Sequence, residues 1–388
     1  MHVLVIPGTF PGPYNLYRGI FFQNQVQALA ENDNISVGVI APDIRSSKAL
    51  KQLKNIRLFG SEYELKTDRN VTVYRKIGFN LTPLTSLGVQ LLFYKYAEKL
   101  FEKYIQKHGK PDLIHAHISL HAGYAAQKLS VKYNIPYVIT EHSSAILKNE
   151  LSLREKRVVK QVLSSACRCI AVSNQLKNKI ELDFEVKPVV IPNVVKLPEK
   201  KQEKNTPKDP NLLVSVGTLI MSKGFADLLK AFQICLQKRP ELKLQIVGDG
   251  RDAHIFKKLA KQLNISDHVE FTGALPPENV HSIMKTAGVF ISASKFETFG
   301  VVLVEAAAAG TPIVSTNSGG PKDIVTEVNG VICPVNDYKK LADAVLKILE
   351  NPEKYVEQEI IDDTYERFNP KSITQLVIKN YKKCLKHL

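Results

Sequence analysis

Two carboxylates, Glu297 and Glu305, flank the start of a predicted helix in the segment 291–320, ISASKFETFGVVLVEAAAAGTPIVSTNSGG. Glu305 lies within VVLVEAAAA, which is apolar on nearly every face and so is typical of a helix packed inside a domain. An ionised carboxylate buried without a partner costs several kcal/mol, so we expect Glu305 to bind something, and sugar hydroxyls would serve. Glu297 precedes the same helix, whose free N–H groups and positive dipole end suit an oxygen-rich or anionic ligand.

Both carboxylates also have interpretations that need no ligand. Ser294 and Glu297 have the spacing of a capping box, in which the two side chains satisfy backbone N–H groups at a helix start. Glu305 could pair with a buried lysine or arginine. The spacing alone leaves these alternatives open.

Three further groups of residues could contact a ligand. Lys223, with Thr218 upstream, follows the first predicted strand of the second half, where a cation can hold a phosphate. Gly248, after the next strand, would let the backbone approach a nucleotide closely. His117 ends the strand of DLIHAH, and His142 follows a later strand; a neutral imidazole can hydrogen-bond a sugar hydroxyl, although a histidine at a strand end can also be structural.

The elements that must position these residues alternate between short β-rich runs and helical stretches, the pattern of a parallel α/β sheet. This pattern occurs twice, once on each side of residues 196–210. That segment is charged and contains three prolines, which indicates a linker. The predicted strands are 3–7, 36–41, 71–75, 113–116, 137–140, 169–172 and 189–192, then 212–217, 243–247, 269–272, 289–292, 313–315 and 331–334. The predicted helices are 23–30 and 122–132, then 225–239, 255–263, 277–285, 301–309, 339–350 and 371–388.

Length and composition indicate a globular chain of two domains. The chain has 388 residues, of which 44% are hydrophobic and 23% charged. No apolar run approaches the roughly 20 residues of a transmembrane helix, and the start of the chain lacks the features of a signal peptide. The five cysteines are odd in number and lie mostly in apolar segments, so we expect reduced, buried thiols in a cytosolic protein.

The net charge of +15 is concentrated in the first half, with +11 over residues 1–195 and +4 over residues 196–388. A basic surface attracts phosphates, nucleic acid or anionic lipid, and it can also serve solubility alone. A non-enzymatic nucleic-acid-binding protein is therefore one alternative, but it has no use for Glu297 and Glu305.

Taken together, these motifs resemble a known family. Glu297, Phe299-Gly300, Glu305-Ala306 and Gly310-Thr311-Pro312 reproduce the E-F-G…E-A…G-x-P signature of the retaining glycosyltransferases of family 4, the glycosyl transferases group 1. Lys223-Gly224 and Gly248 match two further motifs. The chain departs from the pattern at Thr218, where the family has an arginine that clamps the donor diphosphate, and at Asp323, where it has a glutamate.

The resemblance implies an α/β protein with two Rossmann-like domains facing across a cleft, the GT-B fold. The acceptor domain would span 1–195, completed by about 370–388, and the nucleotide-sugar-binding domain would span 211–369. Such an enzyme moves a hexose from a nucleotide-diphosphate sugar, most commonly a UDP-sugar, to its acceptor with retention of configuration. A glycan or lipid-linked acceptor and a role in cell-surface polysaccharide synthesis fit a basic enzyme at the cytoplasmic face of a membrane. No metal or other cofactor and no nucleic acid are expected, and a nucleotide-sugar epimerase of the same fold is the nearest alternative.

The resemblance also assigns roles to residues. Glu297 and His117 would be catalytic, by contact with the donor sugar. Gly12, Arg18 and His142 would line the acceptor side. The donor would be bound by Lys223, Thr218, Gly248, Thr298, Phe299, Gly300, Val301 and Glu305.

One segment, 78–96, is apolar and aromatic and has lysines on either side. Such a stretch could lie on an anionic membrane or hold a lipid-linked acceptor. The alternative is an ordinary core helix and loop, and the pattern slightly favours this second interpretation.

Overall fold

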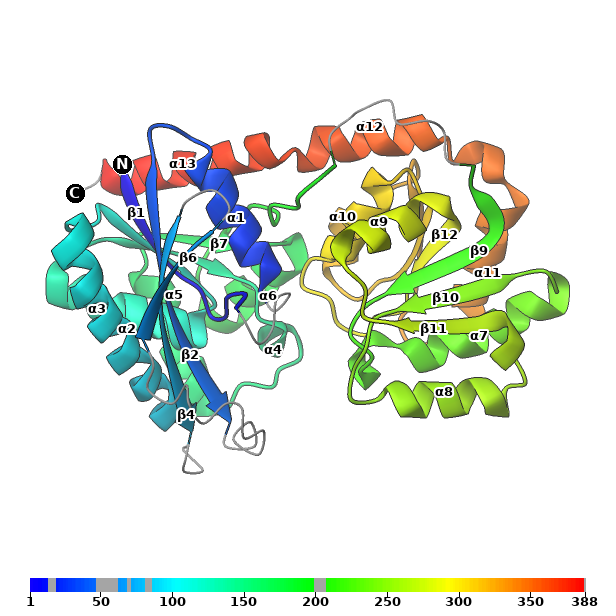
Figure 1. Ribbon diagram of the computed structural model, residues 1–388, viewed down its shortest axis with the longest axis horizontal. Coiled ribbons are helices and arrows are strands. Elements are labelled where there is room, and N and C mark those ends of the chain that lie inside the picture. The colour runs from blue at the N-terminus through cyan, green and yellow to red at the C-terminus, as the bar shows by residue number, and fades with distance from the viewer. Residues whose placement is uncertain (13–18, 47–61, 68–70, 81–85, 199–206, 387–388) are drawn as a thin grey trace. The chain divides into compact units, whose positions relative to one another are not determined.

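Apolar five-residue runs such as HVLVI and LIHAH form the central strands of the protein, which we describe from a computed structural model. The structure describes all residues except 13–18, 47–61, 68–70, 81–85, 199–206 and 387–388. The chain divides into two units (Figure 1). Unit 1 comprises Met1–Val194 and Pro370–Leu388, and unit 2 comprises Val195–Asn369.

The described part of unit 1 contains an eight-stranded sheet in the order β3-β4-β2-β1-β5-β6-β7-β8. All neighbouring strands are parallel except β3 and β4. The central strands β5 and β6 are buried along their whole length, including the polar side chains of His115, His117, Thr140 and Glu141. The strands are β1 (His2–Ile6), β2 (Ser36–Ser46), β3 (Glu62–Lys66), β4 (Thr72–Asn80), β5 (Leu113–His117), β6 (Tyr137–Glu141), β7 (Arg168–Ala171) and β8 (Val189–Val190).

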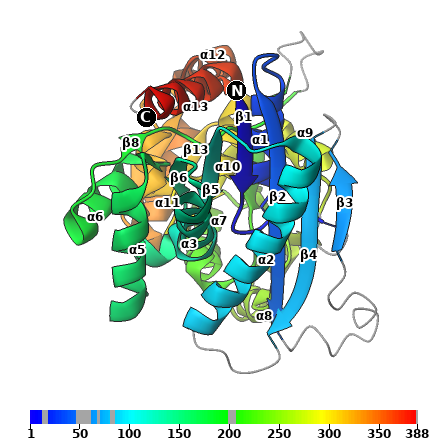
Figure 2. The same cartoon turned by 90° about the vertical axis from the view of Figure 1, so that its left-hand side faces the viewer.

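Helices cover both faces of this sheet. On one face α1 packs against α13, and on the other α3 packs between α2 and α5 (Figures 1 and 2). A capping box of Ser152 and Glu155 starts α5. The helices of unit 1 are α1 (Ile20–Ala30), α2 (Ser86–His108), α3 (Tyr124–Tyr133), α4 (Ser144–Leu147), α5 (Leu153–Ser165), α6 (Asn174–Phe184) and α13 (Pro370–Leu385).

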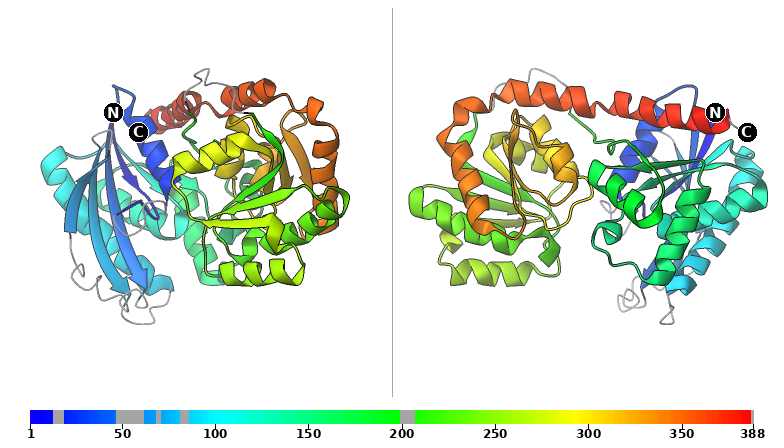
Figure 3. Two further views of the ribbon diagram at one scale, coloured as in Figure 1. Left: turned by 45° about the vertical axis from the view of Figure 1, so that its right-hand side comes forward. Right: turned by 180° about the vertical axis from the view of Figure 1, so that it is seen from behind.

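Unit 2 contains a six-stranded parallel sheet in the order β11-β10-β9-β12-β13-β14. Its strands are β9 (Asp209–Val216), β10 (Lys243–Val247), β11 (Val269–Gly273), β12 (Ala287–Ser292), β13 (Ile313–Thr316) and β14 (Gly330–Cys333). Helix α7 packs against α8 and α11, and α10 packs against α9 and α12 (Figure 3). These helices are α7 (Phe225–Lys238), α8 (Ala253–Gln262), α9 (Pro277–Thr286), α10 (Val301–Ala308), α11 (Tyr338–Glu350) and α12 (Glu357–Phe368).

Each sheet has a point where the strand order reverses direction. In unit 1 this point lies between β1 and β5, and in unit 2 it lies between β9 and β12. Ligands of open α/β sheets bind outside the carboxyl ends of the strands at such points. The loops that follow β1 and β5, and those that follow β9 and β12, are therefore the expected ligand-binding positions.

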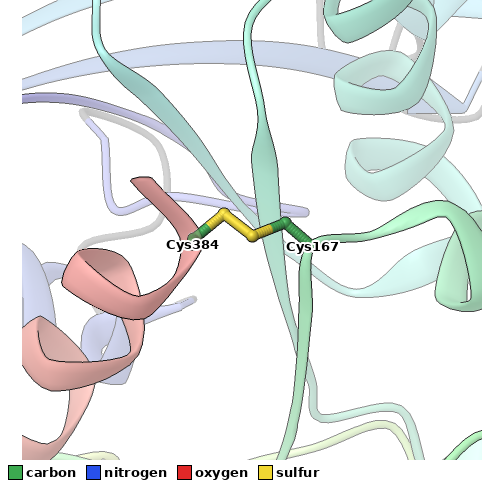
Figure 4. Close-up of a disulfide and its surroundings, with 2 residues drawn as sticks. All are labelled: Cys167 and Cys384. Carbon is green, nitrogen blue, oxygen red and sulfur yellow. A yellow bond between two sulfur atoms is a disulfide. The ribbon is translucent and has the colours of Figure 1, made fainter. Parts of the chain in front are cut away.

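The expectation of five reduced cysteines is wrong for two of them. Cys167, just before β7, forms a disulfide with Cys384 of α13, and their Cα atoms are 5.6 Å apart (Figure 4). The two cysteines are separated by 217 positions, so only the fold could reveal their pairing. Cys169, Cys235 and Cys333 are free and buried.

The apolar segment 78–96 belongs to two elements, with residues 81–85 outside the described part. It begins at the end of β4 and continues into α2, which runs on to His108. Phe93, Ala97 and Leu100 of α2 are buried, as in an ordinary helix packed on a sheet. No helix in the described residues combines the length and the apolar character that crossing a membrane requires.

Candidate functional site

Lys223 and Glu297 meet beside the point in unit 2 where the strand order reverses. A short turn after β9 presents Lys223, and the loop after β12 presents Glu297. The Lys223 Nζ atom lies 2.5 Å from Glu297 Oε2, and the two side chains are 30% and 19% exposed. Both side chains are partly exposed to solvent, so each could contact a ligand in place of the other.

The capping-box interpretation of Ser294 and Glu297 is wrong. Helix α10 begins at Val301, its N-cap is Gly300, and no side chain caps it. The backbone of Glu297 instead forms a bridge with Gly319 of the loop after β13. Two hydrogen bonds fix the loop at this point, because the Glu297 N–H donates to the Ser318 carbonyl and its carbonyl accepts from the Gly320 N–H.

The loop between Glu297 and α10 provides no side-chain cap, so no described side chain accepts a capping hydrogen bond from the first backbone N–H groups of the helix. Gly300 has φ 108°, a conformation that favours glycine. Phe299 is 1% exposed and its ring packs edge-on against Phe368, so it anchors the loop rather than offering its side chain to a ligand. Thr298 is half-buried and Val301 opens the helix. These positions suit an anionic group near the helix start.

The side chain of Glu305, on α10, has no hydrogen-bond or ion-pair partner in the part of the chain that the structure describes. Burial raises the pKa of Glu305 to about 7. The alternative of pairing with a buried lysine or arginine is therefore wrong within the described structure, and the carboxyl keeps its hydrogen-bonding capacity for a ligand.

Gly248 brings the backbones of neighbouring loops together at the same edge of the unit 2 sheet. It has φ 134°, and a Cβ atom there would lie 2.0 Å from the Gly217 carbonyl oxygen. The Gly248 N–H donates to the Gly273 carbonyl. Thr218, next to Gly217, is exposed. Arg251, which follows nearby, has a side chain 82% exposed and lies 3.8 Å from Asp252.

In unit 1, His117 and His142 form a buried pair beside the corresponding reversal point. His117 ends β5 and His142 follows β6. His117 Nδ1 lies 3.0 Å from His142 Nε2, and the side chain of Phe22 packs against both rings. His117 Nε2 has no hydrogen-bond partner in the described structure. No group of three or more His, Cys, Asp or Glu side chains in the described part of the chain could hold a metal ion.

These imidazoles are neutral at physiological pH. Burial lowers the pKa of His142 to about 3 and holds the pKa of His117 well below its ordinary value. His115 lies two residues before His117 on β5, and burial likewise lowers its pKa to about 3. Its Nδ1 atom lies 2.6 Å from the hydroxyl of Tyr381 on α13, a contact between residues 266 positions apart.

Sequence reasoning missed a buried arginine beside the loop after β1. Arg75 of β4 is 3% exposed and donates hydrogen bonds from Nη2 to the carbonyls of Phe10, at 2.9 Å, and Pro11, at 2.6 Å. A Cβ atom on Gly12 would lie 2.8 Å from Arg75 Nη1, so a larger residue there would require the end of the Arg75 side chain to shift. Arg18, the other residue predicted in this loop, lies outside the described residues.

Two family models match the chain. The model for glycosyl transferases group 1 matches residues 197–362, and the model for glycosyltransferase family 4 matches residues 19–198. The chain belongs to the family 4 glycosyltransferases. The prediction of a transferase enzyme is thereby confirmed.

Relatives of this glycosyltransferase span most of its length. TuaC of Bacillus subtilis (strain 168), a glycosyltransferase named for teichuronic acid biosynthesis, is 27% identical over 94% of this chain and 93% of its own. A glycosyltransferase of Methanocaldococcus jannaschii, MJ1178, is 27% identical over 78% of this chain and 83% of its own.

Solved structures share the fold of this glycosyltransferase. Sucrose-phosphate synthase of Thermosynechococcus elongatus is 20% identical with a TM-score of 0.79, and each chain is covered completely. HepE of Anabaena, solved in complex with UDP-glucose, is 19% identical with a TM-score of 0.70 over 98% of this chain and 99% of its own. The predicted fold, with two Rossmann-like domains of the GT-B type, is confirmed.

Proposed function

We propose that this glycosyltransferase moves a hexose from a UDP-sugar to a glycan or lipid-linked acceptor, with retention of configuration, in cell-surface polysaccharide synthesis. The observation that carries the proposal is the partnerless carboxyl of Glu305 in the same unit as the Lys223–Glu297 ion pair. The complex of HepE with UDP-glucose and the name of TuaC support the choice of donor and of pathway class. Unit 2 would be the nucleotide-sugar-binding domain and unit 1 the acceptor domain.

Donor binding would exchange one set of partners for another in unit 2. The carboxylate of Glu305 accepts hydrogen bonds from the ribose hydroxyls. The diphosphate binds Lys223 and the free N–H groups at the start of α10, and Thr218 donates one hydrogen bond but adds no charge. As Lys223 turns to the phosphate, Glu297 is released to hold hydroxyls of the sugar.

The same groups would stabilise the reaction where charge develops. The bond between the anomeric carbon and the phosphate oxygen breaks, and the diphosphate leaves with its negative charge near Lys223 and the helix start. The acceptor oxygen forms its bond on the same face of the sugar, and its proton passes to the leaving phosphate oxygen. His117, which burial keeps neutral, offers its unpartnered Nε2 to a sugar hydroxyl.

A basic enzyme suits an acceptor that is attached to an anionic membrane. The chain carries a net charge of +15, and α2 presents Lys99 and Lys103 beside Glu62 at one edge of unit 1. We propose peripheral association with the inner face of the membrane through basic residues. Nucleic acid is not proposed as a partner.

Thermal unfolding tests the donor assignment directly. The full chain is heated with UDP, GDP, ADP or CMP, each with and without its sugar, and the experiment is repeated with Glu305→Ala. A ligand at about 100 times its dissociation constant stabilises by roughly 2.7 kcal/mol. We expect UDP and a UDP-sugar to stabilise the wild type and to lose most of this effect in Glu305→Ala.

The exposed Glu278 of α9 provides a matched control, since Glu278→Ala should keep the full UDP effect. A wild type that none of the four nucleotides stabilises would overturn the donor site. A transfer product whose anomeric proton, measured by NMR, shows inversion would overturn retention.

A further inference from the structure

The buried carboxylate of Glu141, at the end of β6, has a role that the proposed donor and acceptor contacts leave unexplained. Its side chain is 1% exposed and accepts four hydrogen bonds. Oε2 accepts from the Ser119 N–H, at 3.0 Å, and from the Ser119 hydroxyl. Oε1 accepts from the N–H groups of His142 and Ser143, each at 2.8 Å. No ion pair with a described lysine, arginine or histidine accompanies these bonds.

These four bonds join the carboxyl ends of two neighbouring strands. Ser119 lies two residues after His117, which ends β5, and His142 directly follows Glu141, which ends β6. The two imidazoles therefore stand on backbone segments that one carboxylate holds together. Their own hydrogen bond, 3.0 Å long, depends on that spacing.

The segment between the strands carries an unusual backbone conformation. Ile118 has φ 75° and ψ 121°, in a region that β-branched residues almost never adopt. The other non-glycine residues with positive φ in the described structure are asparagines and one glutamate. A π turn, Ser119–Gly123, follows at once, and both features gather at functional sites in proteins.

Hydrogen bonds around Ile118 keep it in this conformation. Its N–H donates to the Thr140 carbonyl, and its carbonyl accepts from the Gly123 N–H. The resulting turn places the Ile118 side chain against the loop after β1, where a Cβ atom on Gly8 would lie 3.0 Å from Ile118 Cδ1. Ser119, which directly follows Ile118, donates two hydrogen bonds to the Glu141 carboxylate. The carboxylate therefore holds the backbone next to the strained residue.

We propose that Glu141 is a positioning residue of the transferase. Its carboxylate holds Ile118 in the positive-φ conformation, and this fixes the direction of His117 and its hydrogen bond with His142. The inference rests on the proposed function, because it assigns His117 to the donor sugar. Glu141→Gln keeps the size of the side chain but replaces one oxygen, which accepts two of the four hydrogen bonds, by an N–H₂ donor.

Steady-state kinetics of the full chain test the proposal. We expect Glu141→Gln to lower kcat by about 100-fold, because a displacement of roughly 1 Å at a reacting group has an effect of that size. The affinity for UDP should change less than threefold, since the proposed nucleotide contacts belong to unit 2. Adding Ile118→Gly should raise the kcat of Glu141→Gln at least tenfold, because glycine adopts a positive φ without strain.

Glu185→Gly is the matched control for general stabilisation. Glu185 also lies in unit 1 and has φ 59°, at the end of α6 and away from the His117 turn. Combined with Glu141→Gln, it should leave kcat low. If Glu185→Gly restores kcat as well as Ile118→Gly does, or if Ile118→Gly restores nothing, the positioning role is overturned.

A second readout separates this proposal from the proposed function. The ¹⁵N resonances of the imidazole rings report which nitrogen carries the proton, and they need no substrate. Spectra of His117→Gln and His142→Gln assign the two rings. Glu141→Gln should alter both rings, and Ile118→Gly should return them towards the wild-type positions.

The two hypotheses then fail in different ways. A wild type that transfers no sugar from any donor, with the imidazole changes and their reversal as expected, overturns the proposed function and supports the positioning of His117 by Glu141. A wild type that transfers sugar, with unchanged kcat and unchanged imidazole resonances in Glu141→Gln, overturns the positioning role alone.

Discussion

Glu141 in unit 1 is buried and Glu305 in unit 2 is half-buried, and the two carboxyl groups differ most in their hydrogen bonds. Glu141 accepts four hydrogen bonds from the protein. Glu305 accepts none from the described residues, and burial raises its pKa to about 7. Burial therefore does not by itself indicate a ligand. Unsatisfied hydrogen-bonding capacity is the better indicator of a ligand. It distinguishes a structural carboxylate, such as that of Glu141, from a candidate ligand-binding carboxyl, such as that of Glu305.

The same contrast extends to the groups around them. Unit 1 gathers neutral imidazoles, His115, His117 and His142, each with a pKa lowered by burial. Unit 2 gathers the charged pair Lys223 and Glu297, which solvent can reach. Negative charge that develops on a leaving diphosphate is stabilised best by a cation and helix N–H groups, and the diphosphate site that we propose in unit 2 would use Lys223 and the start of α10.

The largest effect should follow from removal of the cation in unit 2. Lys223→Met keeps an unbranched side chain of nearly the same length but removes the charge from the proposed diphosphate site. We expect the rate of sugar transfer to fall about 10²- to 10³-fold, the usual effect of deleting one group that stabilises developing negative charge. Initial rates with a saturating UDP-sugar measure this.

Lys295→Met is the matched control. Lys295 lies in the loop after β12, its side chain is 37% exposed, and its Nζ atom lies 3.9 Å from Asp227 Oδ2. It should retain most of the activity. A double-mutant cycle with Glu297→Gln should be non-additive, because the two side chains contact each other. Additive losses would show that the Lys223–Glu297 contact has no role in the reaction.

The next effect concerns unit 1 alone. Cys384→Ser removes the disulfide that ties α13 to the segment before β7. We expect unit 1 to lose about 2–4 kcal/mol of unfolding free energy, since the cross-link closes a long loop. Denaturant unfolding in the absence of reductant measures the change, and the UDP effect on unit 2 should persist.

Reductant provides the control for this prediction. It should lower the stability of the wild type to that of Cys384→Ser and should have no effect on the variant. Equal stability of the wild type with and without reductant would contradict a stabilising disulfide.

The pKa of Glu305 makes unit 2 dependent on pH. Burial raises this pKa from 4.5 in the unfolded chain to about 7, so the folded state holds the proton more tightly. The resulting stabilisation is complete below about pH 4.5 and is lost as the pH rises through about 7. Glu305→Gln should remove this loss and be up to about 3 kcal/mol more stable than the ligand-free wild type at pH 8.

Donor affinity should depend on pH in the opposite direction. The ionised carboxylate accepts hydrogen bonds from the ribose, so UDP-glucose should bind the wild type more tightly as the pH rises through about 7. Calorimetric titrations between pH 5.5 and 8.5, with Glu305→Gln as the flat control, measure this. A wild-type affinity that does not change with pH would remove Glu305 from the nucleotide site.

Much of this arrangement could be predicted from the sequence, because the relevant signals are local. Strand-like runs and helix stops predicted the α/β fold. The Lys223 and Glu297 motifs predicted residues at the carboxyl ends of β9 and β12, and the structure brings those two side chains together. An all-apolar helix around one carboxylate predicted that Glu305 would need a binding partner, but it did not decide between a ligand and a buried lysine or arginine.

What could not be predicted depends on contacts between distant residues. β3 is a polar edge strand, EYELK, whose composition resembles a charged loop. The Cys167–Cys384 pairing and the Tyr381–His115 contact each join residues more than 200 positions apart. The strain at Ile118 follows from the geometry between two strand ends, which no local pattern of residue types describes.

The smallest expected effect, and the one that sharpens the contrast between the units, comes from Thr218→Arg. Thr218 follows β9 and is exposed, so a longer side chain requires no repacking. An arginine there can bind phosphate oxygens with two parallel hydrogen bonds as well as its charge. We expect the Kd for UDP-glucose to fall about tenfold, which corresponds to about 1.4 kcal/mol, while Thr218→Ala changes it little.

The salt dependence of this gain decides its origin. An added charge next to the diphosphate should lose part of its advantage as ionic strength rises, because salt screens partly exposed charges. A gain in Thr218→Arg that is unchanged by salt would indicate packing instead. No gain at all would mean that Lys223 and the start of α10 already saturate the diphosphate, and that the charge chemistry of unit 2 is complete without an arginine.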